Sequence, residues 1–210
     1  ETWTFQGPRL YEDHYRAMIE MVERHGKIPV VWGDMITGMY LRPSERKIWE
    51  NILKSDILDR VFIANWDYSA QTKEFFLNKI ESFGSQRKDK QIVCPGLSNW
   101  NKFYPDFDCA IENMKNFIGA AAQKGLPGFL ITAWGDDGEE CLFSFLKPLL
   151  LAGMEVAVGS GQWEQKWISL SGEDEDVLCV RKTFGRPELT NNLKHLLFAD
   201  FRYYRMNESD

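Results

Sequence analysis

Four short apolar runs, separated by segments with the period of an α-helix, restrict most strongly how this 210-residue chain can fold. The runs lie at residues 28–35, 60–68, 91–100 and 128–137, and their β-branched and aromatic residues are typical of strands. They are nearly continuous rather than alternating, as expected for parallel strands covered on both faces. The sequence therefore predicts parallel strands joined by helical crossovers.

Helical periodicity predicts the elements between and around these strands. In the first helical segment, Tyr15, Met18, Ile19 and Val22 fall on one face. The last segment is apolar nearly all round, which predicts a heavily packed helix. Helices are expected at residues 11–26, 44–55, 70–84, 107–125 and 141–159. We expect residues 1–159 to form one domain and residues 160–210 to add helices packed on it.

Four tryptophans recur at the ends of the strand-like runs. Trp32, Trp66, Trp100 and Trp134 are each 34 residues apart (66−32, 100−66 and 134−100). Tetratricopeptide helix pairs share this period, but here each Trp ends or follows a strand-like run instead of lying early in a helix. A βα unit of a barrel has about the same length. The pattern therefore predicts a repeated strand–Trp–loop–helix unit.

Acidic and amide residues accompany these tryptophans. Asp34, Asp67 and Asp136 lie within two residues of a Trp. The third strand end carries polar and aromatic residues instead: Ser98, Asn99, Asn101 and Tyr104. The carboxyl ends of parallel strands share one edge of a sheet. Indole rings suit the C–H faces of a pyranose, and carboxylates and amides accept hydrogen bonds from its hydroxyls. The sequence therefore predicts a shared carbohydrate site.

Metal and cofactor chemistry find no support in the residue spacing. The acids Asp136, Asp137, Glu139 and Glu140 lack the alternating spacing of a calcium loop, and the two Glu residues are expected to cap the next helix. No CxxC or HExxH pattern occurs, so we predict neither a metal nor a cofactor. The cysteines are far apart within apolar segments, which predicts buried free thiols: Cys94, Cys109, Cys141 and Cys179.

Charge and hydropathy argue against two classes of partner. The net charge of -6 and the lack of a long basic run argue against nucleic-acid binding. The longest apolar stretch is interrupted by Lys147 and Pro148, so no membrane span is predicted. The opening residues, ETWTFQGPRL, have neither the basic head nor the apolar core of a signal peptide. The expected location is therefore cytoplasmic.

Three of these motifs point to a known enzyme family. PVVWGDM, ANWDY and FLITAWGDDGEE resemble the later strands of family 20 glycoside hydrolases, the exo-β-N-acetylhexosaminidases, and most of all the hexosaminidase D-like branch. The resemblance covers residues 1–158. It implies an α/β fold, a (β/α)8 TIM barrel, of which this chain carries strands five to eight. It also implies a partner for the strand edges, either a first half-barrel or a second copy of the chain.

The resemblance also implies a reaction. The family removes terminal non-reducing β-linked N-acetylhexosamine (GlcNAc or GalNAc) by a retaining mechanism in which the substrate's own acetamido oxygen attacks the anomeric carbon. An adjacent Asp-Glu pair serves this step. Glu1 corresponds to the Glu, the general acid and then base, and the Asp is expected directly before it.

The remaining roles carried over from the family concern substrate binding. Trp32, Trp66 and Trp134 would surround the acetamide and the sugar ring, and Tyr68, or else Tyr104, would donate to the acetamide oxygen. Asp136 would accept from the O4 and O6 hydroxyls. Asp34 would either hold the acetamide side or brace the site. Trp3 and Trp100 are expected at the rim.

Two other functions fit the same residues. A glycosidase with two catalytic carboxylates could draw them from Asp34, Asp67 and Asp136. Such an enzyme would also cleave glycosides that lack an acetamido group. Alternatively, the chain is a carbohydrate-binding half-barrel without catalytic activity, which would bind N-acetylglucosamine without turnover.

Overall fold

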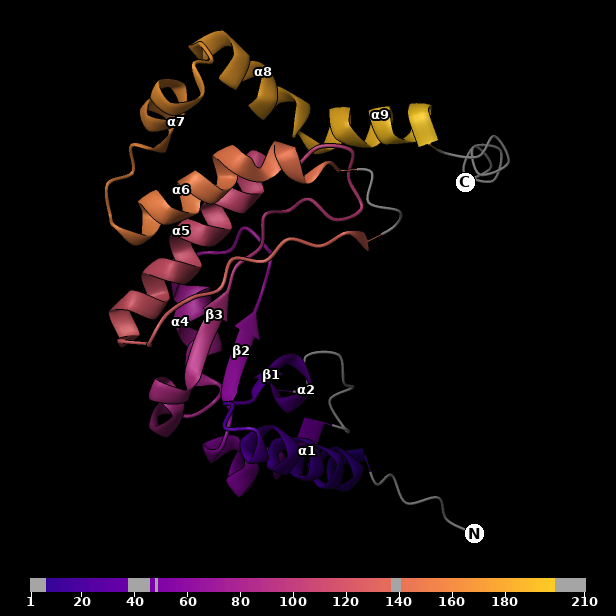
Figure 1. Cartoon of the computed structure of the whole chain (residues 1–210), viewed down its shortest axis with the longest axis vertical. Coiled ribbons are helices and arrows are strands. Elements are labelled where there is room, and N and C mark those ends of the chain that lie inside the picture. The colour runs from indigo at the N-terminus through magenta and orange to yellow at the C-terminus, as the bar shows by residue number, and fades with distance from the viewer. Residues whose placement is uncertain (1–6, 38–45, 48, 137–140, 199–210) are drawn as a thin grey trace. The chain divides into compact units, whose positions relative to one another are not determined.

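The computed structural model describes residues 7–37, 46–47, 49–136 and 141–198. Of these residues 62% are helical, and three strands form a single sheet (Figure 1). The chain divides into two compact units. The first contains the chain up to Asp67, together with Thr72–Cys94 and Phe117–Leu130. The second contains Tyr68–Gln71, Pro95–Asn116 and the chain from Ile131 onward.

Helices and strands alternate through the first half of the chain, and helices follow in the second half. In order they are α1 (Gly7–Arg24), β1 (Val30–Trp32), α2 (Asp34–Thr37), β2 (Phe62–Trp66), α4 (Lys73–Glu81), β3 (Gln91–Cys94), α5 (Phe107–Lys124), α6 (Lys147–Ala157), α7 (Trp163–Ser171), α8 (Glu175–Phe184) and α9 (Pro187–Phe198). Short 3-10 turns lie at Ile52–Lys54, Asp56–Asp59, Ser85–Lys90 and Phe143–Leu146.

Most of the predicted helices are confirmed. α1, α4, α5 and α6 fall within or overlap the segments in which apolar residues recur at helical spacing. The segment 44–55 is different, because its described part ends in the 3-10 turn Ile52–Lys54 and forms no single long helix. The predicted helices beyond residue 160 are present as α7, α8 and α9.

The sheet is parallel, and β2 is its central strand. The strand order is β1-β2-β3, with Val31 paired to Ile63 and Ala64 paired to Ile92. Figure 1 shows the three strands side by side. Ile63, Ala64 and Asn65 of β2 are all buried, as expected for a strand with neighbours on both edges. The first three predicted strands and their parallel pairing are therefore confirmed.

The predicted fourth strand does not form, and the sheet does not close. Residues around Phe129 and Thr132 make only isolated parallel bridges, to Val93 and Gly96. Between these two bridges lies Pro95, which has no backbone N–H to donate, so the ladder is interrupted. The described part of the chain thus holds an open three-stranded sheet and a majority of helix. The prediction of strands five to eight of a (β/α)8 barrel is wrong.

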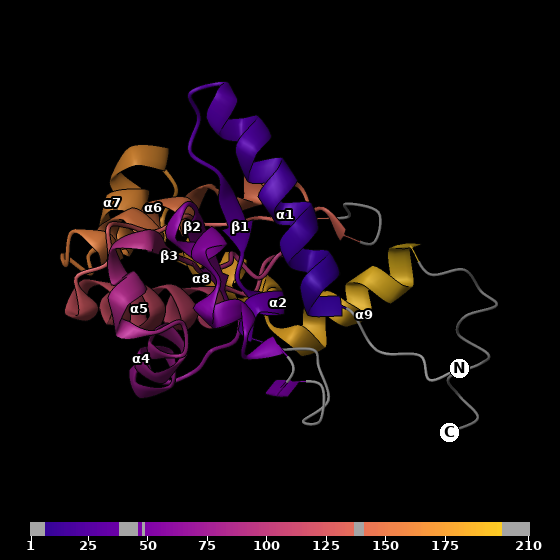
Figure 2. The same ribbon diagram turned by 90° about the horizontal axis from the view of Figure 1, so that it is seen from below.

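A buried cluster in the first unit joins α1 to the sheet. Ile19 of α1 packs with Val31 of β1, and Trp49 and Phe83 belong to the same cluster. Figure 2 shows α1 running beside β1. The predicted burial of Ile19 is confirmed, but Met18, expected on the same face, is 43% exposed. The buried stripe of α1 is therefore narrower than its sequence pattern suggests.

A second cluster of the first unit fills the space between α4 and α5. The rings of Phe76 and Phe117 stack with centroids 4.3 Å apart, and Val93 of β3 packs against them. Both views show α4 and α5 as neighbours (Figures 1 and 2). Each ring is fully buried, so these two side chains contribute strongly to the hydrophobic free energy of this unit.

Two buried amides connect three elements of the first unit. The Asn65 side chain on β2 donates to Gln91 Oε1 on β3 at 2.7 Å. Gln91 Nε2 in turn donates to the Ile80 carbonyl oxygen of α4 at 3.2 Å. Because unpaired amides are costly to bury, this chain of bonds allows polar residues in the centre of the sheet.

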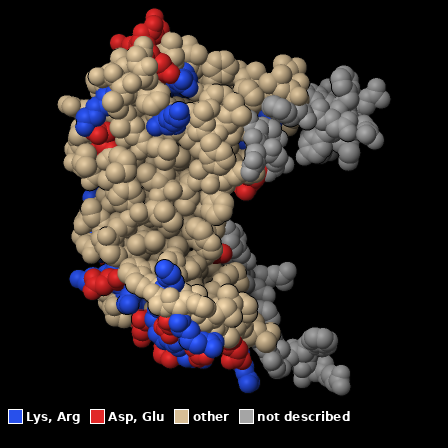
Figure 3. Space-filling view, in the orientation of Figure 1, with Lys and Arg blue, Asp and Glu red and all other residues tan. Residues whose placement is uncertain are grey.

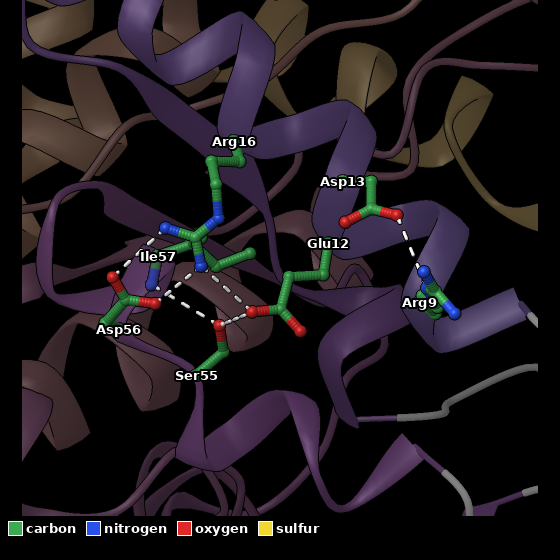
Figure 4. Close-up of polar contacts among 7 residues, drawn as sticks. All are labelled: Arg9, Glu12, Asp13, Arg16, Ser55, Asp56 and Ile57. Atoms are coloured by element: carbon green, nitrogen blue, oxygen red, sulfur yellow. Dashed lines mark hydrogen bonds and ion pairs between the residues drawn. The ribbon is translucent and has the colours of Figure 1, made fainter.

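Charged side chains of both signs gather over α1 and the turn at Asp56–Asp59. Figure 3 shows them intermixed there. The Arg16 guanidinium makes a bidentate contact with the Asp56 carboxylate, with N–O distances of 2.6 and 3.1 Å, and it also donates to Glu12 (Figure 4). Ser55 donates to the same Glu12 carboxylate at 2.6 Å. These contacts fix the orientation of α1, although exposed ion pairs add little stability each.

In the second unit, an ionic group holds the start of α8. Arg181 donates to Glu173 through Nε at 2.8 Å and to the Tyr104 hydroxyl at 2.8 Å. The Trp167 indole donates to the same Glu173 carboxylate. The hydrogen bond from Arg181 lowers the pKa of Glu173 below its usual value. Folding therefore favours the charged form of this carboxylate.

α6 is less buried than its sequence predicts. Pro148 occupies the first turn, where its missing N–H costs nothing. Leu149 and Ala152 are buried, but Met154 is 54% exposed, so the prediction of a helix packed on all sides is wrong. Within the ranges described above, none of the helices combines the length and apolar character needed to cross a membrane.

The first prediction concerns the close packing around Gly33. A Cβ at this position would lie 2.7 Å from Phe83 Cζ and 3.1 Å from Ile63 Cγ2, both in fully buried side chains. We expect Gly33→Ala to lower the free energy of unfolding by roughly 1–3 kcal/mol in urea denaturation, because neither neighbour has room to move. Gly128→Ala is the control, since nothing lies within 4 Å of its Cβ. Equal losses in both variants would contradict the packing described.

The second prediction concerns the pH dependence that Glu173 creates. Its folded-state pKa is lowered, so its stabilisation is complete above the unfolded pKa of about 4.3 and is lost as pH falls through the folded value. We expect Glu173→Gln to cost roughly 1–2 kcal/mol of unfolding free energy at pH 7. The difference from the parent should shrink as the pH falls below the unfolded pKa of about 4.3 and through the lower folded value.

The matched control for this change is Glu164→Gln. Glu164 of α7 pairs with Lys182 of α8, but both side chains are more exposed than Glu173 and Arg181. The control should change the unfolding free energy by at most about 0.5 kcal/mol. A difference between Glu173→Gln and the parent that stays constant from pH 7 to 3 would show that the carboxylate charge is not responsible.

Candidate functional site

Three aromatic residues from separate loops meet in the second unit. Tyr68 follows β2, Trp100 follows β3 by several residues, and Trp134 ends the segment that was predicted as the fourth strand. The Tyr68 and Trp100 ring centroids are 4.6 Å apart, and those of Tyr68 and Trp134 are 6.5 Å apart. All three are half-buried, so each ring also has an accessible part. We call these three residues the aromatic cluster.

A hydrogen bond between two of the rings fixes their orientation. Trp134 Nε1 donates to the Tyr68 hydroxyl oxygen at 2.8 Å. An indole N–H can only donate, so Tyr68 is the acceptor here. A tyrosine hydroxyl that accepts one bond still carries a hydrogen of its own to donate. The bond therefore holds the Tyr68 hydroxyl and the Trp134 indole next to each other.

The backbone of Trp134 is held by Asn99. Asn99 Nδ2 donates to the Trp134 carbonyl oxygen at 2.7 Å, and the Trp134 N–H donates to Asn99 Oδ1 at 3.3 Å. Asn99 is buried. The sequence predicted that amides at this strand end would accept hydrogen bonds from a ligand. This amide instead binds protein backbone through both of its ends.

The loop that carries Trp100 contains two residues in a left-handed conformation. Ser98 has φ 50° and Asn101 has φ 57°. Asn adopts this region several times more often than most residues, whereas Ser does so rarely. The Ser98 hydroxyl accepts from Lys102 Nζ at 2.8 Å, which helps to hold the turn. Such strained positions often occur at binding sites, where the surrounding structure enforces them.

The first unit contains the other predicted Trp and Asp residues. Trp66 Nε1 donates to Asp34 Oδ1 at 3.1 Å, so Asp34 lies where it braces an indole. Trp32, at the end of the edge strand β1, is 41% exposed. Asp67 is buried, and its carboxylate lies 3.2 Å from Lys79 Nζ. In this unit the structure brings Asp34 and Trp66 into contact.

Tyr104 is buried in the second unit and forms hydrogen bonds there. Its hydroxyl accepts from Arg181 at 2.8 Å, and its backbone N–H donates to Thr190 Oγ1 at 2.8 Å. Burial raises the pKa of Tyr104 above its usual value. Of the two tyrosines considered for the acetamide contact, Tyr104 is thus buried and bonded within the second unit.

Some of the predicted site residues lie outside the ranges that the structure describes. Glu1 and Trp3 lie outside the described residues, as do positions 137–140 of the acidic segment. Asp136 is described and exposed. Of the predicted site residues, Trp32, Asp34 and Trp66 belong to the first unit and Tyr68, Trp100, Trp134 and Asp136 belong to the second.

A pocket of about 630 Å³ lies within the second unit. Its walls include Asp106, Cys109, Trp163 and Lys182. None of the predicted site residues is among those that line it. Its charged residues are already engaged in part, since Lys182 pairs with Glu164 and Asp106 lies 3.4 Å from Lys102.

The cysteines are free thiols, but they are not all buried. Cys94 and Cys141 are buried as predicted, Cys109 is half-buried, and Cys179 on α8 is exposed. Burial raises the pKa of the Cys94 and Cys141 thiols to about 12. Among the residues whose positions the structure gives, no group of three or more His, Cys, Asp or Glu side chains is arranged to hold a metal ion.

Comparison of the sequence with known protein families and with curated proteins found no match.

The third prediction tests the packing of the aromatic cluster on Gly96. A Cβ at Gly96 would lie 2.7 Å from Tyr68 Cδ1 and 2.9 Å from Trp100 Cζ3. We expect Gly96→Ala to displace both rings, to change the near-UV circular dichroism, and to cost roughly 1–3 kcal/mol of unfolding free energy. Gly119→Ala on α5 is the control, because its Cβ would meet only the end of Lys73 at 3.8 Å. An unaltered near-UV spectrum in Gly96→Ala would refute this packing.

Proposed function

We propose that this chain binds terminal N-acetylhexosamine and forms the sugar-binding part of a β-N-acetylhexosaminidase. Two observations support the proposal, and they share Tyr68 and Trp134. The first is the resemblance of PVVWGDM, ANWDY and FLITAWGDDGEE to that enzyme family. The second is the aromatic cluster, whose members come from loops far apart in the sequence. The open sheet removes any support from a barrel fold, so the proposal depends on these residues alone.

The observation that carries the proposal is the contact between Trp134 and Tyr68. Their 2.8 Å hydrogen bond places an apolar indole face and a phenolic hydroxyl next to each other. A pyranose offers apolar C–H faces, and an acetamide offers a carbonyl acceptor. Packing against the aromatic rings contributes the apolar part of the binding free energy, and a positioned O–H group fixes the orientation of the sugar. Trp100, with its centroid 4.6 Å from that of Tyr68, extends the same surface.

In the proposed reaction, the residues of this chain hold the substrate rather than form a covalent bond with it. The acetamido oxygen of the substrate is the nucleophile in this class of enzyme. Tyr68 donates to that oxygen and orients it, and Asp136 accepts from sugar hydroxyls. Glu1 protonates the leaving oxygen and then activates water. The role of Glu1 follows from the sequence resemblance.

A mechanism with two protein carboxylates is less well supported. Asp34 already accepts from the Trp66 indole, and Asp67 is buried beside Lys79 Nζ at 3.2 Å. Both carboxylates are thus engaged with protein groups of their own unit. An acid or nucleophile of a glycosidase must face the scissile bond. This observation favours substrate assistance over the two-carboxylate alternative.

The fourth prediction tests the proposal in the full-length protein. We expect Trp134→Ala to weaken N-acetylglucosamine binding by roughly 30-fold, because a central aromatic contact is lost. Asp136→Ala should weaken it by about tenfold through loss of a charged acceptor. Calorimetric titration measures binding, and hydrolysis of 4-nitrophenyl N-acetyl-β-glucosaminide measures kcat/KM.

Two control variants lie elsewhere in the same unit. Trp167→Phe changes an indole that bonds to Glu173, and Asp108→Ala removes an exposed carboxylate of α5. Both should leave sugar binding unchanged. Binding without hydrolysis would identify a carbohydrate-binding protein. If the parent protein bound no N-acetylglucosamine, or if both site variants bound it normally, the proposal would be rejected.

A further inference from the structure

We infer that Asn113 and Asn99 are positioning residues of the sugar site. Neither belongs to the residues that the family resemblance assigns to that site. The inference rests on the proposed function, since it concerns the geometry of the same aromatic cluster. Both side chains are buried, and each connects loops that are distant in sequence.

Asn113 ties together the two loops that carry Tyr68 and Trp100. It lies on α5 and is 0% exposed. Its Oδ1 accepts from the Gly96 N–H at 3.0 Å, and its Nδ2 donates to the Ser69 carbonyl oxygen at 2.8 Å. Ser69 is the residue after Tyr68. One amide thus fixes the backbone on both sides of the contact between Tyr68 and Gly96.

The hydrogen bond from the Gly96 N–H to Asn113 affects the Tyr68 and Trp100 rings because of where Gly96 lies. Gly96 lies directly against Tyr68 and Trp100, since a Cβ there would come within 2.7 and 2.9 Å of them. A shift of the Gly96 backbone by a few tenths of an ångström therefore moves the surface on which both rings pack. Asn113 controls that shift because it holds the Gly96 N–H.

Asn99 has the matching role for the third ring. Its amide binds the N–H and the carbonyl of Trp134, at 3.3 and 2.7 Å. Asn113 therefore sets the Tyr68 and Trp100 side of the cluster, and Asn99 sets the Trp134 side. The bond from Trp134 Nε1 to Tyr68 joins the two sides. This bond forms only when both loops hold their positions.

Both positions require an amide. Gly96 and Trp134 each offer an N–H, which needs an acceptor, and Ser69 and Trp134 each offer a carbonyl, which needs a donor. Aspartate has nearly the same shape but only accepts when it is ionised. Asn113→Asp and Asn99→Asp therefore keep one bond each and turn the other into a contact between two oxygens.

The experiment compares these variants by two readouts in the full-length protein. The first is N-acetylglucosamine affinity by calorimetric titration. The second is the Trp134 indole ¹H–¹⁵N resonance, assigned through Trp134→Phe, which reports the bond to Tyr68 without any sugar. We expect each variant to bind at least about tenfold more weakly and to shift this resonance toward the solvent-exposed value.

Asn116→Asp is the matched control. Asn116 lies one turn further along α5, and its Nδ2 donates to the Gln71 carbonyl oxygen at 2.7 Å. It makes the same kind of bond to the same loop, but three residues beyond Tyr68. The control should retain the Trp134 resonance and should bind the sugar within about twofold of the parent.

The outcomes separate this inference from the proposed function. A parent protein that binds no N-acetylglucosamine overturns both. If the parent binds, normal affinity and an unchanged Trp134 resonance in Asn113→Asp and Asn99→Asp overturn the inference alone. Loss of the whole fold in both variants, with a folded Asn116→Asp, assigns the two amides a purely structural role and also overturns it.

Discussion

The parallel pairing of β2 with a neighbour on each edge is the constraint on which the described structure depends. This pairing provides hydrogen-bond partners for the backbone N–H and C=O groups of a strand whose centre, from Ile63 to Asn65, is buried. The amide chain through Asn65 and Gln91 then connects the sheet to α4. Because β2 ends at Trp66, the chain delivers an indole, a carboxylate and a phenol in three consecutive residues.

The sequence predicted the three strands and the long helices, because apolar runs and helical periodicity record burial directly. It failed at the fourth strand for a local reason that was visible in the residues. Pro95 lies in a run that otherwise resembles a strand, and a residue without an N–H cannot continue a ladder. The bonds from Leu130 to Val93 and from Thr132 to Pro95 remain on either side of that position. Strand propensity alone therefore cannot predict whether a ladder continues, because it takes no account of a missing hydrogen-bond donor.

The candidate site could be predicted only in part. Residue type located the indoles and Tyr68, since large aromatics at strand ends are unusual enough to be noticed. The roles of the amides were not predictable, because Asn99 and Asn113 bind backbone groups 35 and 44 residues away in the chain. An asparagine in a loop looks the same whether it faces a ligand or holds another loop. Similarly, the sequence left open whether Asp34 holds the acetamide side or braces the site, and it gave no indication of the bond from Trp66 to Asp34.

The residue ranges of the two compact units alternate along the chain, and this limits how the units can be separated. The second unit begins at Tyr68, resumes at Pro95 and is completed only after Ile131, while the first unit occupies the intervals. No single cut separates one unit intact from the other. Expressing either unit alone would therefore require several separate pieces of the chain to be joined.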